Sequence, residues 1–125
     1  MSTLKVNAFQ NTSGAGWYPS KAWINYNGTT ATIRDDGNHS SVTDNAVGGY
    51  TFNLSNAFST ANYAPVMVAT DETGSTGSYG YAYGCWVKSV DNDFNTSNWE
   101  INIGYPANNL RYDQEFVFAT VVGDL

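Results

Sequence analysis

The chain has 125 residues, a formal net charge of −6, 13% charged residues and 15% aromatic residues. A chain of this length makes one domain that buries roughly two thirds of its unfolded surface. The negative charge argues against binding to nucleic acids or anionic membranes. No apolar run approaches the roughly 18 residues that would span a bilayer, and the lone Cys85 excludes an intrachain disulfide.

Residues 1–20 are predicted to form an extended N-terminal arm. Short apolar positions alternate irregularly with Asn, Thr, Ser and Gly, and nothing repeats at helical spacing. An arm of this kind usually needs a neighbour to order it. We therefore expect it to mediate attachment or contacts between subunits, through Leu4, Val6, Phe9 and Trp17.

The first strands of a domain over residues 21–125 follow the arm. Two short strands between Ala22 and Arg34 are expected to be joined at Asn27-Gly28, a dipeptide that suits a tight hairpin turn. A second turn is expected at residues 35–38, followed by a strand over Ser40 to Thr43.

Later segments also have the patterns of strands. Residues 50–55 alternate apolar and polar side chains, so one face of that strand is expected to be buried. Residues 56–63 are predicted to form a corner in which Phe58 and Tyr63 plug the core. Residues 65–69 and 115–122 are apolar on both faces, which predicts central strands, and two further strands are expected over residues 79–88 and 98–105.

Seven or eight short strands with turns between them and no helix predict an all-β fold. The expected architecture is a single antiparallel β-sandwich of jelly-roll type, built from residues 21–125 and carrying the arm at its N-terminal end.

Residue types that could support catalysis are few. His39 is the only histidine and follows Asp35 and Asp36, so a catalytic triad would need the fold to bring a nucleophile to it. A solvated loop histidine is the expected alternative. Carboxylate pairs that could serve a glycosidase lie in turn-rich segments where charges normally stay hydrated. We therefore predict no enzyme and no cofactor; the pairs are Asp71 with Glu72 and Asp91 with Asp93.

Residues 91–95 place oxygen ligands at alternate positions, as calcium loops do. Thr96 stands where an EF-hand loop needs glycine, and Asn102 where it needs a bidentate glutamate. The segment is predicted to be a turn between strands and no metal site is assigned to it, with a weak calcium site as the minor alternative.

Three tyrosines at a period of two form the candidate ligand or subunit-interface site. Tyr79, Tyr81 and Tyr83 would project from one face of a strand. Such a row could stack on the sugar rings of a host surface glycan or pack against another subunit. Packing within the same sheet is the ordinary use of such residues, so both interpretations stay open.

Three segments resemble a domain that recurs in virion structural proteins of tailed bacteriophages, especially those of aquatic bacteria. They are residues 21–28 (KAWINYNG), residues 41–54 (SVTDNAVGGYTFNL) and the Ala61-Asn62-Tyr63 corner before the strand at residues 66–70. Residues 2–7 and 10–14 are similar to the segment that often precedes that domain. The family pattern has aspartate where Gly49 stands, a difference that we expect to lie on the surface.

The resemblance implies a non-enzymatic virion protein, made in the host bacterial cytoplasm. The first hypothesis is a homotrimeric tail-fibre or appendage component that contacts the host surface. The second is a capsid decoration or cement protein whose arm clamps neighbouring capsid subunits, and the third is a carbohydrate-binding, lectin-like module. The expected partners are further copies of the chain and other virion proteins of the tail or capsid.

Overall fold

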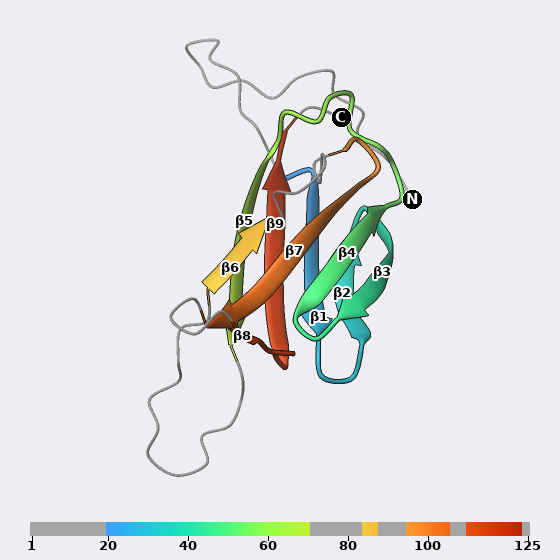
Figure 1. The fold of residues 1–125 in the computed structure, drawn as a ribbon. Coiled ribbons are helices and arrows are strands. Elements are labelled where there is room, and N and C mark those ends of the chain that lie inside the picture. The colour runs from blue at the N-terminus through green and yellow to red at the C-terminus, as the bar shows by residue number, and fades with distance from the viewer. Residues whose placement is uncertain (1–19, 71–83, 88–94, 106–109, 124–125) are drawn as a thin grey trace, which may run out of the picture.

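The computed structural model describes residues 20–70, 84–87, 95–105 and 110–123, which form strands and the turns between them (Figure 1). No helix occurs among these residues, while residues 1–19 of the expected arm lie outside them. The strands are β1 (Ala22–Asn27), β2 (Thr32–Gly37), β3 (His39–Ala46), β4 (Gly49–Leu54), β5 (Ala64–Thr70), β6 (Gly84–Val87), β7 (Asn98–Tyr105), β8 (Leu110–Arg111) and β9 (Phe116–Val122).

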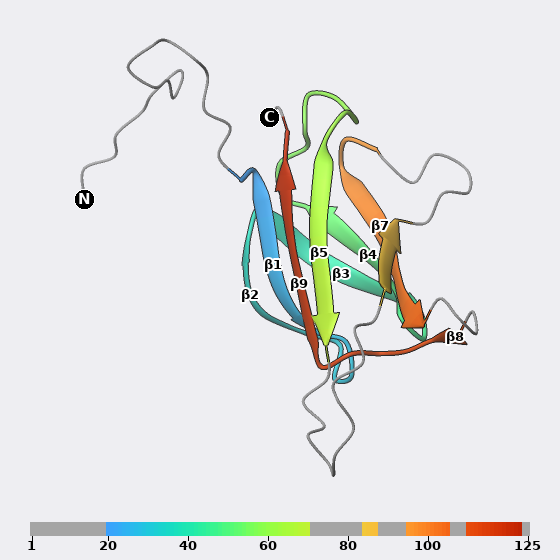
Figure 2. The ribbon, with the colours of Figure 1, turned by 90° about the vertical axis from the view of Figure 1, so that its left-hand side faces the viewer.

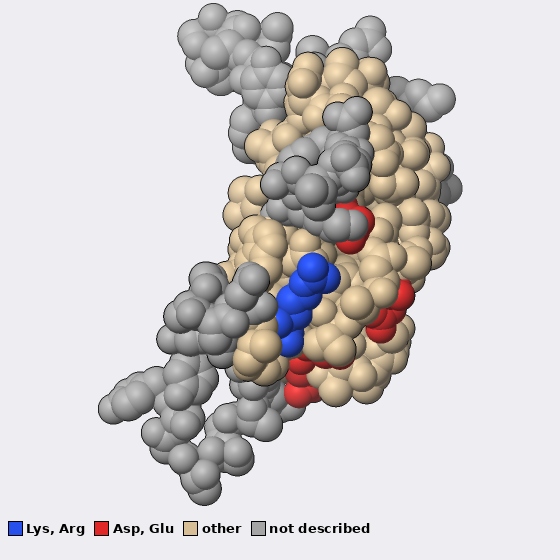
Figure 3. Space-filling model, in the orientation of Figure 1, with Lys and Arg blue, Asp and Glu red and all other residues tan. Residues whose placement is uncertain are grey.

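Two antiparallel sheets face each other, as Figures 1 and 2 show from two directions. One sheet has the strand order β2-β1-β9-β5, and the other has the order β3-β4-β7-β6 with the short β8 beside β7. The predicted antiparallel β-sandwich is therefore confirmed, whereas the jelly-roll subtype stays a prediction. Figure 3 views the molecule from the side of the five-stranded sheet, where charged side chains are few and scattered.

The core lies between the sheets and is filled mainly by alternate residues of four strands. The alternation predicted for residues 50–55 is confirmed in β4, and every second side chain of β7 likewise points inward and is buried. The rings of Phe52 and Trp99, from these two strands, lie 4.7 Å apart at the centre. The inward residues are Ala22, Ile24 and Tyr26 of β1, Tyr50, Phe52 and Leu54 of β4, Trp99, Ile101 and Ile103 of β7, and Val117, Ala119 and Val121 of β9.

The corner before β5 closes one end of this core, as predicted. Phe58 and Tyr63 are both buried, with ring centroids 4.9 Å apart. The Tyr63 hydroxyl donates to the carbonyl oxygens of Asn95 and Asn98, at 3.1 and 3.2 Å. Burial raises the pKa of this phenol to about 12, so it stays a hydrogen-bond donor.

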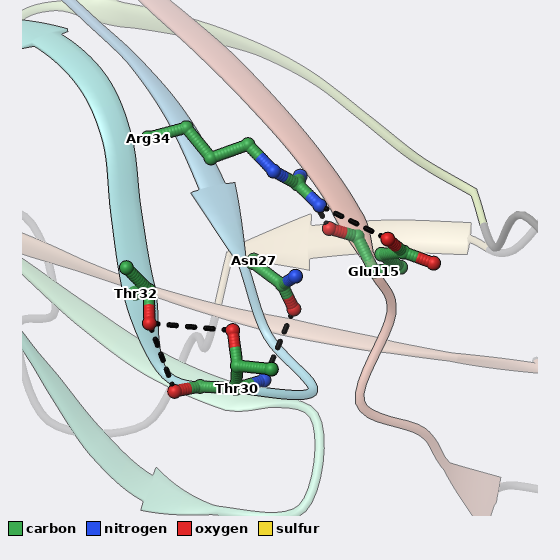
Figure 4. A network of polar contacts seen from close by, with 5 residues as sticks. All are labelled: Asn27, Thr30, Thr32, Arg34 and Glu115. Atoms are coloured by element: carbon green, nitrogen blue, oxygen red, sulfur yellow. Dashed lines mark hydrogen bonds and ion pairs between the residues drawn. The ribbon is translucent and has the colours of Figure 1, made fainter.

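The turn between β1 and β2 differs from the predicted two-residue hairpin. It spans residues 28–31, and its left-handed residue is Ala31, with φ at 52°. Gly28 is instead held by a backbone hydrogen bond to the carbonyl of Gln114, at 2.8 Å. The Asn27 side chain caps the turn by accepting a hydrogen bond from the Thr30 amide at 3.0 Å (Figure 4). A contact distant in sequence therefore sets the form of this turn.

The turn expected at residues 35–38 is confined to its last residue. Residues 35–37 belong to β2, and Asn38, with φ at 66°, turns the chain from the four-stranded into the five-stranded sheet. The Asn38 side chain donates to the carbonyls of Lys21 and Asn56 and accepts from the Asn56 amide. One asparagine thus joins the start of β1 to the segment after β4.

The turn between β3 and β4 depends on Gly48, whose φ is 63°. Its amide donates to Asp113 Oδ1 at 2.7 Å, and its carbonyl accepts from the Ile103 amide at 2.7 Å. The neighbouring Gly49 is buried beside Arg111 and not on the surface, so that expectation was wrong.

The two strands that are apolar on both faces take different places. β9 lies between β1 and β5, as predicted for a central strand. β5 lies at the edge of the sheet, so its prediction as a central strand was wrong. Its apolar outward residues, Val66 and Val68, face solvent at 63% and 56% exposure.

Candidate functional site

A groove of about 430 Å³ lies on the outer face of the four-stranded sheet. Strand register builds it from two rows of side chains that run across β1, β9 and β5. In the first row Trp23 lies beside Thr120, which lies beside Val66. In the second row Asn25, Phe118 and Val68 follow in the same order. All six side chains point away from the core because they alternate with its inward residues.

Thr120 is the middle residue of the first row, between the large Trp23 side chain and Val66. Its hydroxyl is 2.5 Å from the Ser20 hydroxyl and 3.4 Å from the Ala22 carbonyl oxygen, so it is engaged at the β1 side. Thr120 therefore lines the groove with a side chain whose polar group already has partners.

Apolar side chains dominate the surface of the groove. Trp23 is 41% and Phe118 is 38% exposed, and both lie next to the more exposed valines of β5. Monomeric proteins rarely leave several large apolar side chains exposed side by side, and such patches mark interaction sites. This face is therefore the candidate functional site of the described residues.

The Trp23 side chain is held in place by the strand beside it. Gly37 lies opposite Trp23 in β2, and the indole occupies the space that a side chain at Gly37 would need. The Trp23 carbonyl lies 3.1 Å from His39 Nδ1. Trp23 thus forms a preformed wall of the groove.

Charged side chains lie beside the apolar strip in β2, where the exposed Asp35 is opposite Asn25, and near the start of β9. Phe116 stacks on Phe118 at 6.1 Å, and the Arg34 guanidinium lies 4.3 Å from the Phe116 ring centroid. Arg34 also donates to the Glu115 carbonyl at 2.6 Å and pairs with its carboxylate at 3.3 Å (Figure 4). Because both charges are partly exposed, this pair adds little stability and serves to orient Arg34.

The groove offers few polar groups to a ligand. Asn25 lines it, but Asn25 Oδ1 is covered by protein and has no hydrogen-bond partner in the described structure. Sugars need several exposed donors and acceptors in addition to an aromatic platform. The groove therefore suits apolar side chains of a polypeptide better than it suits a glycan.

His39 is a core residue, so the expectation of a solvated loop histidine was wrong. It is 7% exposed and its ring lies 5.9 Å from Phe52. The His39 amide donates to Asp36 Oδ1, whereas Nε2 is buried without a hydrogen-bond partner among the described residues. Burial lowers the pKa of this imidazole, so the neutral form is favoured. These contacts explain His39 as a structural residue at the crossing between the sheets.

A second polar cluster joins β4 to the segment before β9. Asp113 Oδ1 accepts hydrogen bonds from the Gly48 amide and from the Tyr50 hydroxyl, the latter at 2.6 Å. Burial raises the pKa of Tyr50, and the hydrogen bond to Asp113 raises it further. The phenol is thus a permanent donor that ties β4 to the segment before β9, which is a structural role.

Most residues proposed from the sequence lie outside the described residues. These include the tyrosine row Tyr79, Tyr81 and Tyr83, the arm residues Leu4, Val6, Phe9 and Trp17, and the carboxylates Asp71, Glu72, Asp91 and Asp93. Cys85, in β6, is half-buried against the core, and burial raises the pKa of its thiol.

The groove was not predicted, because the apolar residues on both faces of its strands were interpreted as the mark of central strands. Val66 and Val68, like Phe118, belong to strands that are apolar on both faces. That pattern fits a strand covered on both faces and also a strand that carries an exposed apolar surface. Trp23 lies in residues 21–28, which were interpreted only through the family resemblance, so its exposure was not predicted.

Residues 20–70, 84–87, 95–105 and 110–123 contain no group of three His, Cys, Asp or Glu side chains that could hold a metal ion. The same part of the chain has no helix of the length and hydropathy needed to cross a membrane. Comparisons with protein-family models, curated proteins and solved structures found no match.

Proposed function

We propose that this protein is a non-enzymatic structural subunit of a tailed-bacteriophage virion, a homotrimeric tail-fibre or appendage component that contacts the host surface. The sequence segments that resemble phage virion domains supply β1, the β3–β4 hairpin and the corner at residues 61–63. These segments build the core and the turns of the sandwich, so the resemblance extends to positions that determine the fold.

The observation that carries the proposal is the exposed apolar groove. A protein that assembles into a particle needs a contact surface, and this surface is exposed to water when the domain is alone. Trp23 and Phe118 provide large side chains of the kind that dominate binding energy at protein interfaces. The scarcity of charged residues, at 13% of the chain, also favours surfaces that are covered by other subunits.

The first test is the oligomeric state of the purified protein, measured by sedimentation velocity. We expect a trimer whose stability falls on Val66→Asp, because this change places a carboxylate in the groove without touching the core. The matched control is Val47→Asp, since Val47 is 57% exposed in the β3–β4 turn, away from the groove. A monomer at all accessible concentrations, or equal effects of the two changes, would argue against assembly through the groove.

The second test is the copy number of the chain in purified virions of a phage that encodes it, by quantitative mass spectrometry against the major capsid protein. A few to a few tens of copies would support a tail location. A count in the hundreds, in fixed ratio to capsid subunits, would show a capsid decoration protein instead. Absence from the particle would refute the virion assignment in both forms.

A further inference from the structure

We propose that the groove of one subunit is occupied by the N-terminal segment, residues 1–19, of a neighbouring subunit. The inference rests on the proposed function, since it requires that several copies of the chain assemble. It identifies the partner of the apolar face as an extended segment of the same protein.

The direction in which the chain enters the sheet supports a neighbour over the same subunit. The Lys21 amide donates to the Val121 carbonyl at 2.8 Å, and the Ser20 hydroxyl is bonded to Thr120. Residues 20 and 21 therefore continue the line of β1 next to β9. In Figure 2, β1 begins at the end of the sheet where β9 finishes, so residues 20 and 21 lie at this end. For the segment before Ser20 to reach the groove of its own subunit, it would have to reverse its direction.

The length of the segment allows it to reach another subunit. Phe9 precedes Ser20 by eleven residues, which span up to about 36 Å when extended. Leu4 and Val6 can reach further still. Trp17 is three residues from Ser20 and reaches only about 10 Å, so it is not the residue that enters a neighbour's groove.

The chemistry of the segment matches that of the groove. Residues 6–19 carry no charged side chain, and Leu4, Val6 and Phe9 supply apolar groups. Entry of residues 6–19 into the groove therefore desolvates no charged side chain of the segment, which would be costly. It also covers Val66 and Val68, the two most exposed side chains of the face.

The shape of the groove favours a single segment over a second sheet. A flat sheet face laid on this surface would rest on Trp23 and Phe118, the largest side chains of the two rows, and would leave the hollow beside them empty. Empty space at an interface loses dispersion contacts. One side chain from an extended segment can fill the hollow, which is the packing that stable interfaces need.

The test is a photo-cross-linking experiment on the full chain. Phe9 is replaced by p-benzoylphenylalanine, the assembled protein is irradiated, and the products are separated on a denaturing gel. We expect a covalent dimer, in which mass spectrometry finds position 9 joined to residues 66–68 or 118–120. Val66→Asp in the same chain should abolish this cross-link, while the exposed control Val47→Asp should leave its yield unchanged.

Each other outcome contradicts the inference. Cross-links from position 9 to the groove within chains of monomer mass would show that the segment folds back onto its own subunit. Cross-linked dimers joined elsewhere, or equal yields in the two valine variants, would show that the groove is not the docking site. An oligomer that persists with no cross-link at the groove would refute the inference and leave the proposed assembly intact, whereas absence of the protein from virions would refute the proposed function alone.

Discussion

The β3–β4 turn gives the sharpest stability prediction, because two adjacent glycines there have opposite requirements. Gly48 has φ at 63°, where an L-residue is strained, and a side chain on it would clash with the Ile103 carbonyl. It would also come within 2.8 and 2.9 Å of the Tyr112 backbone nitrogen and oxygen. All of these are backbone atoms of neighbouring segments, so they cannot turn aside as a flexible side chain would.

The cost of Gly48→Ala has two parts. Alanine in the left-handed conformation costs about 1–2 kcal/mol. Relief of the clash would weaken the hydrogen bonds that Gly48 makes to Asp113 and Ile103, each worth about 1 kcal/mol. We therefore expect a loss of about 2–4 kcal/mol, a large part of the ~5–15 kcal/mol that typically holds a domain together.

The matched control is Gly49→Ala. A side chain at Gly49 would meet its nearest neighbours, the Ala46 carbonyl oxygen and Arg111 Nη1, at 3.4 Å, which is near ordinary van der Waals distance. We expect this change to alter the free energy of unfolding by less than about 1 kcal/mol. Both variants are measured by urea denaturation of the full chain. If Gly48→Ala proves no more destabilising than Gly49→Ala, the assignment of strain to Gly48 is refuted.

Three further predictions concern titration, a buried hydrogen bond and assembly. Burial depresses the pKa of His39 below its ordinary value near 6.5, so the unfolded chain takes up the proton first as the pH falls. The stability that the neutral His39 contributes is therefore complete above about pH 6.5 and decreases below it. His39→Gln should flatten this part of the profile of unfolding free energy against pH. Tyr50→Phe should cost about 1.5–3 kcal/mol in urea denaturation, because it removes a donor to the charged Asp113; no measurable loss would contradict that role. Val66→Asp should weaken the oligomer in sedimentation velocity while the far-ultraviolet circular dichroism stays unchanged, and Val47→Asp should do neither.

The sequence was sufficient to predict a strand and its buried face where side chains alternate between the core and solvent. In β4 the alternation of Tyr50, Phe52 and Leu54 with polar residues predicted both the strand and its buried face. The inward residues of β7 follow the same alternation. Such alternation reports the environment of each face directly, because a sandwich strand has one face in the core.

The sequence was insufficient to predict burial and turn form where a residue's environment depends on its neighbours in space. Val66 and Val68 lie in a segment with the composition of a central strand, yet among the described strands β5 pairs only with β9. His39 stands among polar residues along the chain and is buried because the chain crosses between the sheets there. At Gly28, a hydrogen bond to Gln114, which is distant in sequence, overrode the local turn preference.

The candidate site was therefore harder to predict than the fold. Its walls come from three strands whose order in the sheet, β1-β9-β5, brings together segments that are roughly 40 to 90 residues apart in sequence. No spacing along the chain reveals that Thr120 lies between Trp23 and Val66. The register of the sheet is needed to place these three side chains in one row.

The placement of β1 beside β9 determines how the sandwich would respond to a pulling force. The two strands are adjacent and antiparallel, with Ala22 opposite Val121, so the described chain enters and leaves the sandwich at the same end. A force that pulls these two ends apart would break the hydrogen bonds between β1 and β9 one after another, like a zipper. A force applied along β1 against the rest of the sandwich would instead load the bonds to β2 and β9 together, in shear. In the proposed assembly, tension that runs along the line of β1 would be resisted in this stronger direction.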